Sequence, residues 1–530
     1  MYQGIDRGMH MKREMHADVA IIGGGLGGFA AALAAARTGK RVVLTEETDW
    51  IGGQVTSQGV PPDEHRWIEE TGCTRSYRQF RDGVRHYYRS HFLLSDLGKK
   101  ADIFNPGNAL VSKVSGDPRT ALAVLLEMAA PYTHSGRLVI LLKHVPESVE
   151  TEGDTVRAVT MRSLESGDRL VLTAPYVLDA TECGDLLPMA GVEYVTGAES
   201  REQTGEPRAL EGAANPSEMQ AITHCFAMDY IEGEDHTIDK PRDYAFWREF
   251  SPDYWPGRML GWIGPHPVTH EARQYVLFPE NDLFPLFDYR RIADKSNFAP
   301  GTFESDITIV NWPQNDYVLG PVIDVSEEEK ARHLDGAKQI SLSLLYWMQT
   351  EAPRLDGKIG YPGLRLRKDI FGTEDGLAKS VYIRESRRIQ AEFTILEQHV
   401  TKEFHPDGKA ERFLDSVGIG YYAIDLHPST ANRNYIHFSP LPFQIPLGSL
   451  IPVRVNNLLP ANKNIGTTHI TNGCYRLHPV EWNIGEAAGL LASFCLDKGV
   501  QPRSVYKDPG LLEQYQQLLT GQGIELIWNL

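Results

Sequence analysis

A glycine-rich turn between two short apolar stretches constrains this chain more than any other feature. The run Asp18-Val-Ala-Ile-Ile-Gly-Gly-Gly-Leu-Gly-Gly28 leads into an Ala-rich segment ending at Arg37, and Arg41-Val-Val-Leu-Thr45 follows. This order predicts a strand, a tight turn, a helix and a second strand, which together form a dinucleotide-binding unit. Free N–H groups at the start of the helix would then face a pyrophosphate.

The glycines of this turn have separate physical roles. Gly23 permits the turn, Gly25 lets a phosphate approach the backbone, and Gly28 lets the helix and strand pack closely. Gly27 lies within the same turn, and we include it among the expected cofactor contacts.

An acidic residue follows the second predicted strand, as the dinucleotide pattern requires. The carboxylate of Glu46 can accept hydrogen bonds from ribose hydroxyls; Glu47 is the alternative, and its distance to the next glycine pair favours Glu46. That pair, Gly52-Gly53-Gln54, resembles the glycine doublet of FAD proteins in the glutathione-reductase-like superfamily. There the backbone passes close to the ribityl chain and the flavin ring. The resemblance implies that Gly52, Gly53 and Gln54 contact FAD.

Three further segments read as strands, at residues 137–150, 156–162 and 169–179. The last runs into Ala180-Thr-Glu-Cys-Gly-Asp, which resembles the strand-ending Ala-Thr-Gly-Asp of the same superfamily with two residues inserted before the glycine. The resemblance implies FAD contacts from Ala180 and Thr181, and a backbone contact between Val145 and the adenine.

A block near the C-terminus completes the pattern. Residues 456–461 form a short apolar stretch, and residues 476–489 predict a helix with Pro479 in its first turn and small residues near its end. The N-terminus of that helix would direct amide groups at the pyrimidine end of the flavin, where negative charge accumulates on reduction. We include Asn483 of this helix among the cofactor contacts.

Together these blocks resemble the FAD-dependent oxidoreductase family that is distantly related to fumarate reductase and succinate dehydrogenase flavoproteins. Some members of this family carry the label xanthan lyase. The resemblance implies an α/β protein with a discontinuous, glutathione-reductase-like Rossmann-type FAD-binding domain and an inserted α+β substrate domain. We expect the FAD-binding domain at residues 16–190 and 455–500, the substrate domain at 191–454 and a helical segment at 501–530. Further matching stretches are residues 311–316, 382–388, 415–420, 424–428 and 442–446.

Composition narrows the class of protein. The net charge of −17 argues against nucleic-acid binding, and no apolar run approaches the roughly 20 residues that span a bilayer. The five cysteines are widely spaced and include no C-x-x-C, which disfavours a disulfide framework, a zinc site and a redox dithiol. We therefore expect a cytoplasmic protein with no metal. Because no histidine stands in the Gly52-Gly53 block, we expect non-covalent FAD.

Five residues are the candidates for chemistry beside the flavin. His469, His478 and His427 can exchange protons near neutral pH. Arg384 and Arg476 can bind a carboxylate. The plainer alternatives stay open, because histidines before proline often pack and arginines often hold domains or the FAD pyrophosphate.

The expected activity is transfer of a hydride between FAD and a small organic substrate, with carboxylate-bearing compounds among the candidates. The alternatives are a flavin-dependent lyase or isomerase with no net redox change, and a non-catalytic FAD-binding protein. The nearest candidate for a second dinucleotide site, Gly418-Ile-Gly420, lacks the third glycine and a following helix of small residues. The electron acceptor therefore stays open between oxygen, a quinone and a protein partner.

Overall fold

A five-stranded parallel sheet forms the centre of the protein, whose computed structural model describes residues 12–530. The strands lie in the order β24-β8-β2-β3-β4, and every neighbouring pair is parallel. Their bounds are β2 Val19–Ile22, β3 Val42–Glu46, β4 Leu138–Leu142, β8 Tyr176–Asp179 and β24 Leu458–Pro460. The first four come from the N-terminal third and β24 from the C-terminal part, so the sheet is built from distant segments. The predicted α/β, Rossmann-type class is confirmed.

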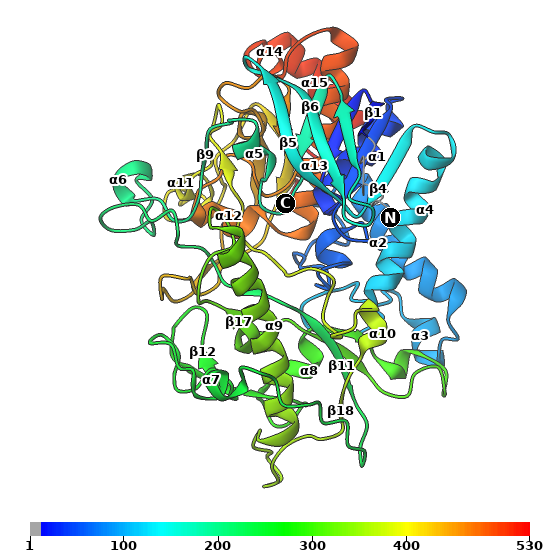
Figure 1. Ribbon diagram of the computed structural model, residues 1–530, viewed down its shortest axis with the longest axis vertical. Coiled ribbons are helices and arrows are strands. Elements are labelled where there is room, and N and C mark those ends of the chain that lie inside the picture. The colour runs from blue at the N-terminus through cyan, green and yellow to red at the C-terminus, as the bar shows by residue number, and fades with distance from the viewer. Residues whose placement is uncertain (1–11) are drawn as a thin grey trace, which may run out of the picture.

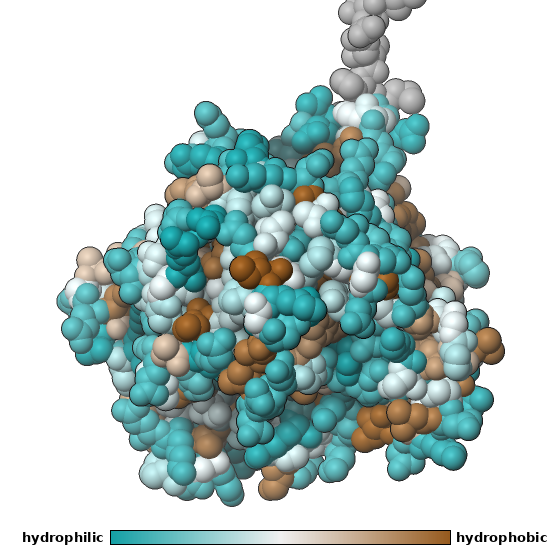
Figure 2. Space-filling model, turned by 90° about the horizontal axis from the view of Figure 1, so that it is seen from below, coloured by the Kyte–Doolittle hydropathy of each residue, from teal (hydrophilic) through white to brown (hydrophobic). Residues whose placement is uncertain are grey.

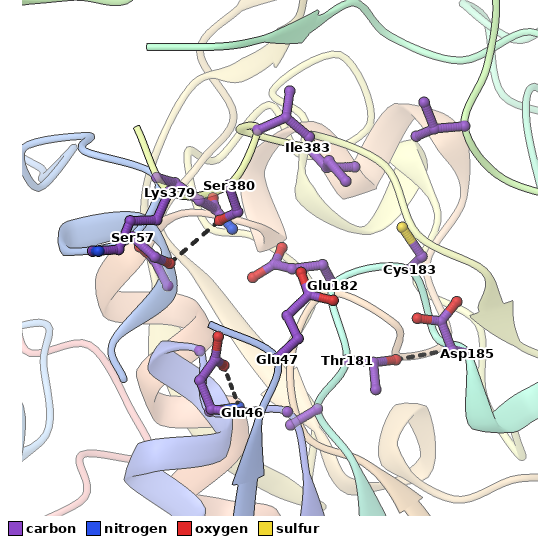
Figure 3. Close-up of a pocket in the computed structure, with 18 of the residues that line it drawn as sticks. Glu46, Glu47, Ser57, Thr181, Glu182, Cys183, Asp185, Lys379, Ser380 and Ile383 are labelled. Atoms are coloured by element: carbon purple, nitrogen blue, oxygen red, sulfur yellow. Dashed lines mark hydrogen bonds between the residues drawn. The ribbon is translucent and has the colours of Figure 1, made fainter. Parts of the chain in front are cut away.

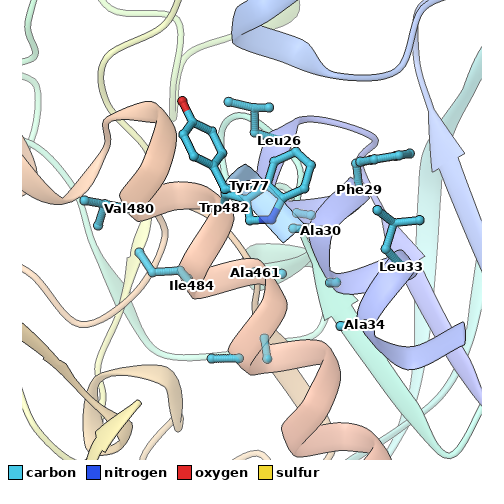
Figure 4. Packing of buried hydrophobic residues seen from close by; sticks show 14 of the residues in the cluster. Leu26, Phe29, Ala30, Leu33, Ala34, Tyr77, Ala461, Val480, Trp482 and Ile484 are labelled. Atoms are coloured by element: carbon cyan, nitrogen blue, oxygen red, sulfur yellow. The ribbon is translucent and has the colours of Figure 1, made fainter. Parts of the chain in front are cut away.

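Two helices far apart in the sequence pack against each other beside this sheet. They are α1 (Leu26–Arg37) and α13 (His478–Lys498), shown with their buried side chains in Figure 4. A Cβ on Gly485 would lie 1.9 Å from the Gly27 carbonyl oxygen. The ring of Trp482 meets that of Phe29 edge-on at 5.9 Å between centroids. Backbone contact therefore explains the small residues that the sequence shows on both helices.

The prediction of one continuous strand at residues 137–150 and of another at residues 169–179 is wrong, because each segment forms two strands. The first is β4 followed by β5 (His144–Glu152), separated by Lys143, whose φ is 56°. The second is β7 (Arg169–Thr173) followed by β8, separated by a segment that contains Pro175. β5 and β7 belong to a second sheet of order β1-β7-β6-β5, with β1 at Lys12–His16 and β6 at Thr155–Ser163. A left-handed residue and a proline thus let the chain change sheets.

The chain between β3 and β4 forms helices, of which α4 packs against β4 and α1. Thr74 caps α2 by accepting a hydrogen bond from the Tyr77 N–H, and Asp117 caps α4 by accepting one from the Arg119 N–H. The elements are η1 Gly53–Val55, α2 Arg75–His91, α3 Asp96–Lys100 and α4 Pro118–His134. The turn after β8 leads into α5, Leu186–Met189.

The middle of the chain forms a second body around a four-stranded sheet of order β15-β16-β11-β18. Its longest helix is α9 (Glu327–Thr350), which begins with a capping box between Ser326 and Glu329. The bounds of the strands are β9 Tyr194–Val195, β10 Ile222–Thr223, β11 Phe226–Tyr230, β12 Ile263–Pro265, β13 Ala272–Val276, β14 Phe284–Pro285, β15 Arg291–Ala293, β16 Ile307–Val310, β17 Asp316–Tyr317, β18 Leu364–Leu366 and β19 Arg388–Ile389. The other helices are α6 Arg201–Thr204, α7 Tyr244–Glu249, α8 Leu286–Tyr289, η2 Lys295–Asn297, η3 Pro313–Asn315, α10 Lys368–Phe371 and α11 Glu397–Val400.

The last part of the chain returns to the first core. Val417 and Ile445 are buried in the same hydrophobic cluster as Phe29 of α1, whereas the core of the second body draws its residues from Cys183 to Val381. The packing thus joins residues 416–446 to the cofactor part, ahead of the expected boundary at 454. The elements here are β20 Ser416–Gly420, β21 Ile424–Leu426, β22 Ile436–Phe438, β23 Phe443–Pro446, η4 Leu447–Leu450, α12 His469–Tyr475, α14 Pro502–Lys507 and α15 Pro509–Gly521.

The two bodies lie one above the other in Figure 1. Blue N-terminal and red C-terminal segments share the upper half, and the green α9 runs down through the lower half. On the lower face in Figure 2, hydrophobic residues occur singly or in small groups among hydrophilic ones. Across residues 12–530, no helix is both long and apolar enough to cross a membrane.

Candidate functional site

A cavity of about 410 Å³ opens at the carboxyl ends of β2, β3 and β8, between the two bodies (Figure 3). The carboxyl edge of a parallel sheet is where such folds bind ligands. One wall is the glycine turn and the ends of these strands, and the other comes from α9 and the segment 379–383. The lining residues used below are Gly23, Gly24, Gly25, Glu46, Glu47, Gly53, Ala180, Thr181, Glu182, Asp185, Lys330, Lys338 and Lys379.

Glu46 stands at the end of β3 with its carboxylate held by the backbone. One oxygen, Oε2, accepts a hydrogen bond from the Gly24 N–H at 3.0 Å, and Oε1 accepts from the N–H and hydroxyl of Thr48 at 2.9 and 2.7 Å. Burial and the neighbouring Glu47 raise the pKa of Glu46 to about 7, against these hydrogen bonds. A fixed acceptor at this edge of the cavity is what a ribose hydroxyl requires.

The turn after β8 is organised by a buried aspartate. Oδ1 of Asp179 accepts from the N–H and hydroxyl of Thr181 at 3.0 and 2.7 Å, and Oδ2 accepts from the Leu186 N–H at 3.1 Å. Thr181 in turn accepts from the Asp185 N–H at 2.7 Å. This network fixes the backbone that carries Glu182 into the cavity, where it contacts Lys463.

The first turn of α1 presents backbone amides to the same region. Gly25 is the N-cap residue and has no side chain to satisfy them. The Gly27 N–H donates to Oε1 of Glu481 at 3.1 Å, and Gln54 donates to the other oxygen of Glu481. Burial raises the pKa of Glu481 to about 7, opposed by Lys463. A Cβ on Gly25 would meet the Glu182 carboxylate at 3.2 Å.

These residues suit a dinucleotide with a diphosphate. Its phosphates need the helix amides and the close backbone approach that Gly25 allows, and its ribose needs the Glu46 carboxylate. The lining brings together six of the expected cofactor contacts, namely Gly23, Gly25, Glu46, Gly53, Ala180 and Thr181.

The other expected cofactor contacts lie behind or beside the cavity wall. Gly28 packs on the Gly23 carbonyl, and Gly52 takes a left-handed φ of 105° beside Leu125. Gln54 bonds to the Arg476 carbonyl at 3.1 Å. Asn483 donates to the Val417 carbonyl at 3.1 Å. Gly27 packs on the Ala461 carbonyl, and Val145 lies on β5 between two lining residues, His144 and Pro146.

Three of the five residues expected to act in chemistry meet in a second, buried polar cluster. Nδ1 of His427 lies 2.5 Å from Asp316, and Nε2 lies 3.6 Å from Asp425. Arg384 is 3.1 Å from the Asp316 carboxylate, and Arg476 is 3.6 Å from that of Asp425. Burial would raise the pKa of Asp316, but Arg384 and His427 outweigh it and lower the value. His427 and His437 likewise hold the pKa of Asp425 well below its usual range, against burial.

Arginine groups in this cluster retain unused donors. Arg476 donates to the Tyr382 hydroxyl at 2.8 Å, and Arg290 forms a bidentate pair with Asp63 at 3.1 and 3.3 Å. Within the described chain, the buried Nε groups of Arg290, Arg384 and Arg476 have no hydrogen-bond acceptor. Buried donors left this way indicate an acceptor supplied by a ligand or water.

The remaining two histidines have structural partners. Nδ1 of His478 accepts from the Asp63 N–H at 3.0 Å, and burial lowers the pKa of His478 to about 4, so the ring is neutral. Nδ1 of His469 lies 3.0 Å from the carboxylate of Glu385, which also accepts a hydrogen bond from the Gln220 side chain at 2.9 Å.

Several residues of the cavity and of the His427 cluster could not be identified as site residues from the sequence. Lys330, Lys338 and Lys379 line the cavity, but they lie in the middle of the chain, far from any dinucleotide pattern. Asp316 lies in the matching stretch 311–316, whose residues also favour a turn, so the sequence did not single out Asp316 as a site residue. Only the three-dimensional arrangement shows that Asp316 contacts His427.

Solved structures with a similar fold include remote likenesses to three flavoproteins. The match to L-proline dehydrogenase from P. horikoshii has 16% identity and a TM-score of 0.19, covering 37% of this chain and about a quarter (27%) of that one. Quinol fumarate reductase from E. coli has 10% identity and a TM-score of 0.32, and the match covers 96% of this chain and 74% of that one. For p-nitrophenol 4-monooxygenase from Pseudomonas putida the identity is 11% and the TM-score 0.35, and the match covers 97% of this chain and 95% of that one. Likenesses this distant carry no argument about the reaction.

None of the curated proteins matches the chain. A family model described as FAD dependent oxidoreductase matches residues 18–519, which is nearly the whole chain. The resemblance drawn from the sequence is thereby confirmed, and FAD is the cofactor. This protein belongs to the family of FAD-dependent oxidoreductases.

Proposed function

We propose that this protein transfers a hydride between FAD, held non-covalently in the cavity of Figure 3, and a small organic substrate bound at the His427 cluster. FAD supplies the hydride acceptor or donor when it is bound. The backbone amides of α1 and the carboxylate of Glu46 support binding of its diphosphate and ribose there. The chain then has to bind the substrate and manage its proton and charge.

The position of His427 between two aspartates is the observation that carries this proposal. Asp316 and Asp425 have lowered pKa values and stay ionised near neutral pH, so their carboxylates orient the imidazole between them. An imidazole held this way can give a proton to a substrate or take one as a hydride moves. We therefore assign proton transfer to His427 in preference to His469 and to the neutral His478.

We propose that Arg384 and Arg476 bind the negatively charged group of the substrate. Both are buried, each retains an unused Nε–H, and each contacts an aspartate that also contacts His427. Because the aspartates already balance part of the arginine charge, a substrate with one carboxylate fits better than one with several. A keto or hydroxyl oxygen could use the same donors.

The test is an anaerobic screen of the holoprotein against carboxylate-bearing metabolites, following flavin absorbance. A substrate of an oxidoreductase bleaches the oxidised flavin, and a second substrate restores it. Consumption of a compound without bleaching would instead favour the redox-neutral lyase or isomerase.

His427→Gln should lower the rate of bleaching about 100-fold or more, as expected for loss of general acid–base catalysis. It should also remove the corresponding limb of the pH–rate profile. His405→Gln is the control, since His405 lies near the surface and bonds to the Gln398 carbonyl. Equal rates in the wild type and His427→Gln would refute the assignment of His427.

A further inference from the structure

Acidic side chains lie on the strand-end wall of the FAD cavity, and lysines lie on the opposite wall. Glu46, Glu47, Glu182 and Asp185 line it, and Glu47 and Glu182 are labelled near its middle in Figure 3. Glu182 is paired with Lys463 and Asp185 with Arg387, whereas across residues 12–530 Glu46 and Glu47 form no ion pair with a lysine or arginine. A diphosphate brings further negative charge into this space. Burying like charges together is unfavourable unless cations compensate for them. The amides of the α1 N-terminus supply only partial positive charge.

Three lysines line the opposite wall, and two of them already have acidic partners. Lys338 lies 2.7 Å from Asp375, and Lys379 lies 2.9 Å from Asp49. Lys330 differs, because across residues 12–530 no carboxylate forms an ion pair or hydrogen bond with its ammonium group. Lys330 and Lys338 are separated by about two helical turns and therefore lie on one face of α9.

The surroundings of Lys330 keep it charged. Burial lowers its pKa, but Cys183, Asp185, Glu327 and Glu47 more than compensate, so the pKa is raised. Asp185 follows β8 and Glu47 follows β3, so Lys330 faces the gap between these strand ends. The first turn of α1 begins at the end of β2, between them.

We propose that the Lys330 ammonium group binds the diphosphate of FAD. The inference rests on the proposal that the cavity holds FAD. Lys330 would neutralise the phosphates from the side opposite the α1 amides, and it comes from the second body. FAD would thus be held by both bodies, with a lysine acting as a point charge on phosphate.

The experiment starts from full-length holoprotein from which FAD is removed, followed by calorimetric titration with FAD and separately with ADP. ADP shares only the diphosphate and adenosine. Lys330→Gln should weaken both ligands by about tenfold or more, and the loss should shrink at high salt. Lys330→Arg should recover most of the affinity, because it keeps the charge.

Arg332→Gln is the matched control, since it removes one positive charge from the exposed side of the same helix. It should leave both affinities unchanged. Unchanged affinity in Lys330→Gln, or a loss shared equally by Arg332→Gln, would overturn the role of Lys330. A lowered thermal midpoint of the ligand-free Lys330→Gln protein that accounts for the weaker binding would overturn it as well.

The outcomes separate this inference from the proposals beneath it. If the wild type binds neither FAD nor ADP, the cavity assignment fails. If it binds both but no substrate bleaches the flavin, the hydride-transfer proposal fails while the Lys330 test still stands.

Discussion

Glycines of the same turn meet different surroundings, and single substitutions should separate their roles. A Cβ on Gly28 would lie 1.9 Å from the Gly23 carbonyl oxygen, which is backbone that cannot move aside. Gly25 has an ordinary φ of −62°, and its added Cβ would meet the ends of two side chains, the carboxylate oxygens of Glu182 at 3.2 Å and Glu481 at 3.7 Å. Gly28 is therefore required for close packing of the fold, whereas Gly25 keeps space free for a phosphate.

We expect Gly28→Ala to destabilise the protein by about 2 kcal/mol or more, the scale of overpacking in a tight core. Gly25→Ala should leave the thermal midpoint of the ligand-free protein nearly unchanged and weaken FAD binding about tenfold. Thermal unfolding and FAD titration of both variants test this. If Gly25→Ala unfolds as readily as Gly28→Ala while its FAD affinity is intact, the division of roles is incorrect.

At the scale of elements, sequence patterns predicted which strands exist better than where they end. Residues 137–150 and 169–179 read as continuous strands because their apolar content continues through the breaks. Lys143 and Pro175 mark those breaks, yet one left-handed residue or one proline is also common at a bulge or an edge. The change of sheet depends on distant partners, which a local pattern does not contain.

The two walls of the cavity also differ in how far they could be predicted from the sequence. The wall made by Gly23, Gly25 and Glu46 was predictable, because a strand, turn and helix fix it within one local unit. The wall made by α9 was not. Which face of this helix covers the cavity is decided by packing between two bodies, and a local pattern does not contain that information.

The turn after β8 should make stability depend on pH. Burial raises the pKa of Asp179 to about 7, whereas an unfolded aspartate titrates near 3.9. The folded state therefore retains a proton that the unfolded state loses. This stabilising contribution is full below about pH 4 and disappears as the pH rises through about 7.

Asp179→Asn cannot ionise, so its thermal midpoint should fall less than that of the wild type between pH 5.5 and 7.5. The variant also loses an acceptor for the Leu186 N–H, but that loss is independent of pH. Asp497→Asn, which alters an exposed partner of Lys40, should retain the wild-type pH dependence. Identical pH dependence in Asp179→Asn would contradict the raised pKa.

At the scale of the whole molecule, the cofactor part is assembled from the two ends of the chain, and the second body closes over it. α1 and α13 share one core, while α9 and the segment 379–383 contribute the facing wall of the cavity. The two bodies have separate hydrophobic cores. A ligand that contacts both walls should therefore stabilise their contact by mass action, in addition to any local effect.

Hydrogen exchange with and without FAD measures this coupling. We expect FAD to slow exchange in the first turns of α9 and at residues 379–383 about as strongly as in the first turn of α1, because the diphosphate joins these walls. α14 and α15 do not line the cavity and serve as the internal reference. In Lys330→Gln at saturating FAD, protection of α1 should persist while that of α9 weakens. Protection confined to α1 in the wild type would mean that the second body does not hold the cofactor, and that the cavity closes by packing alone.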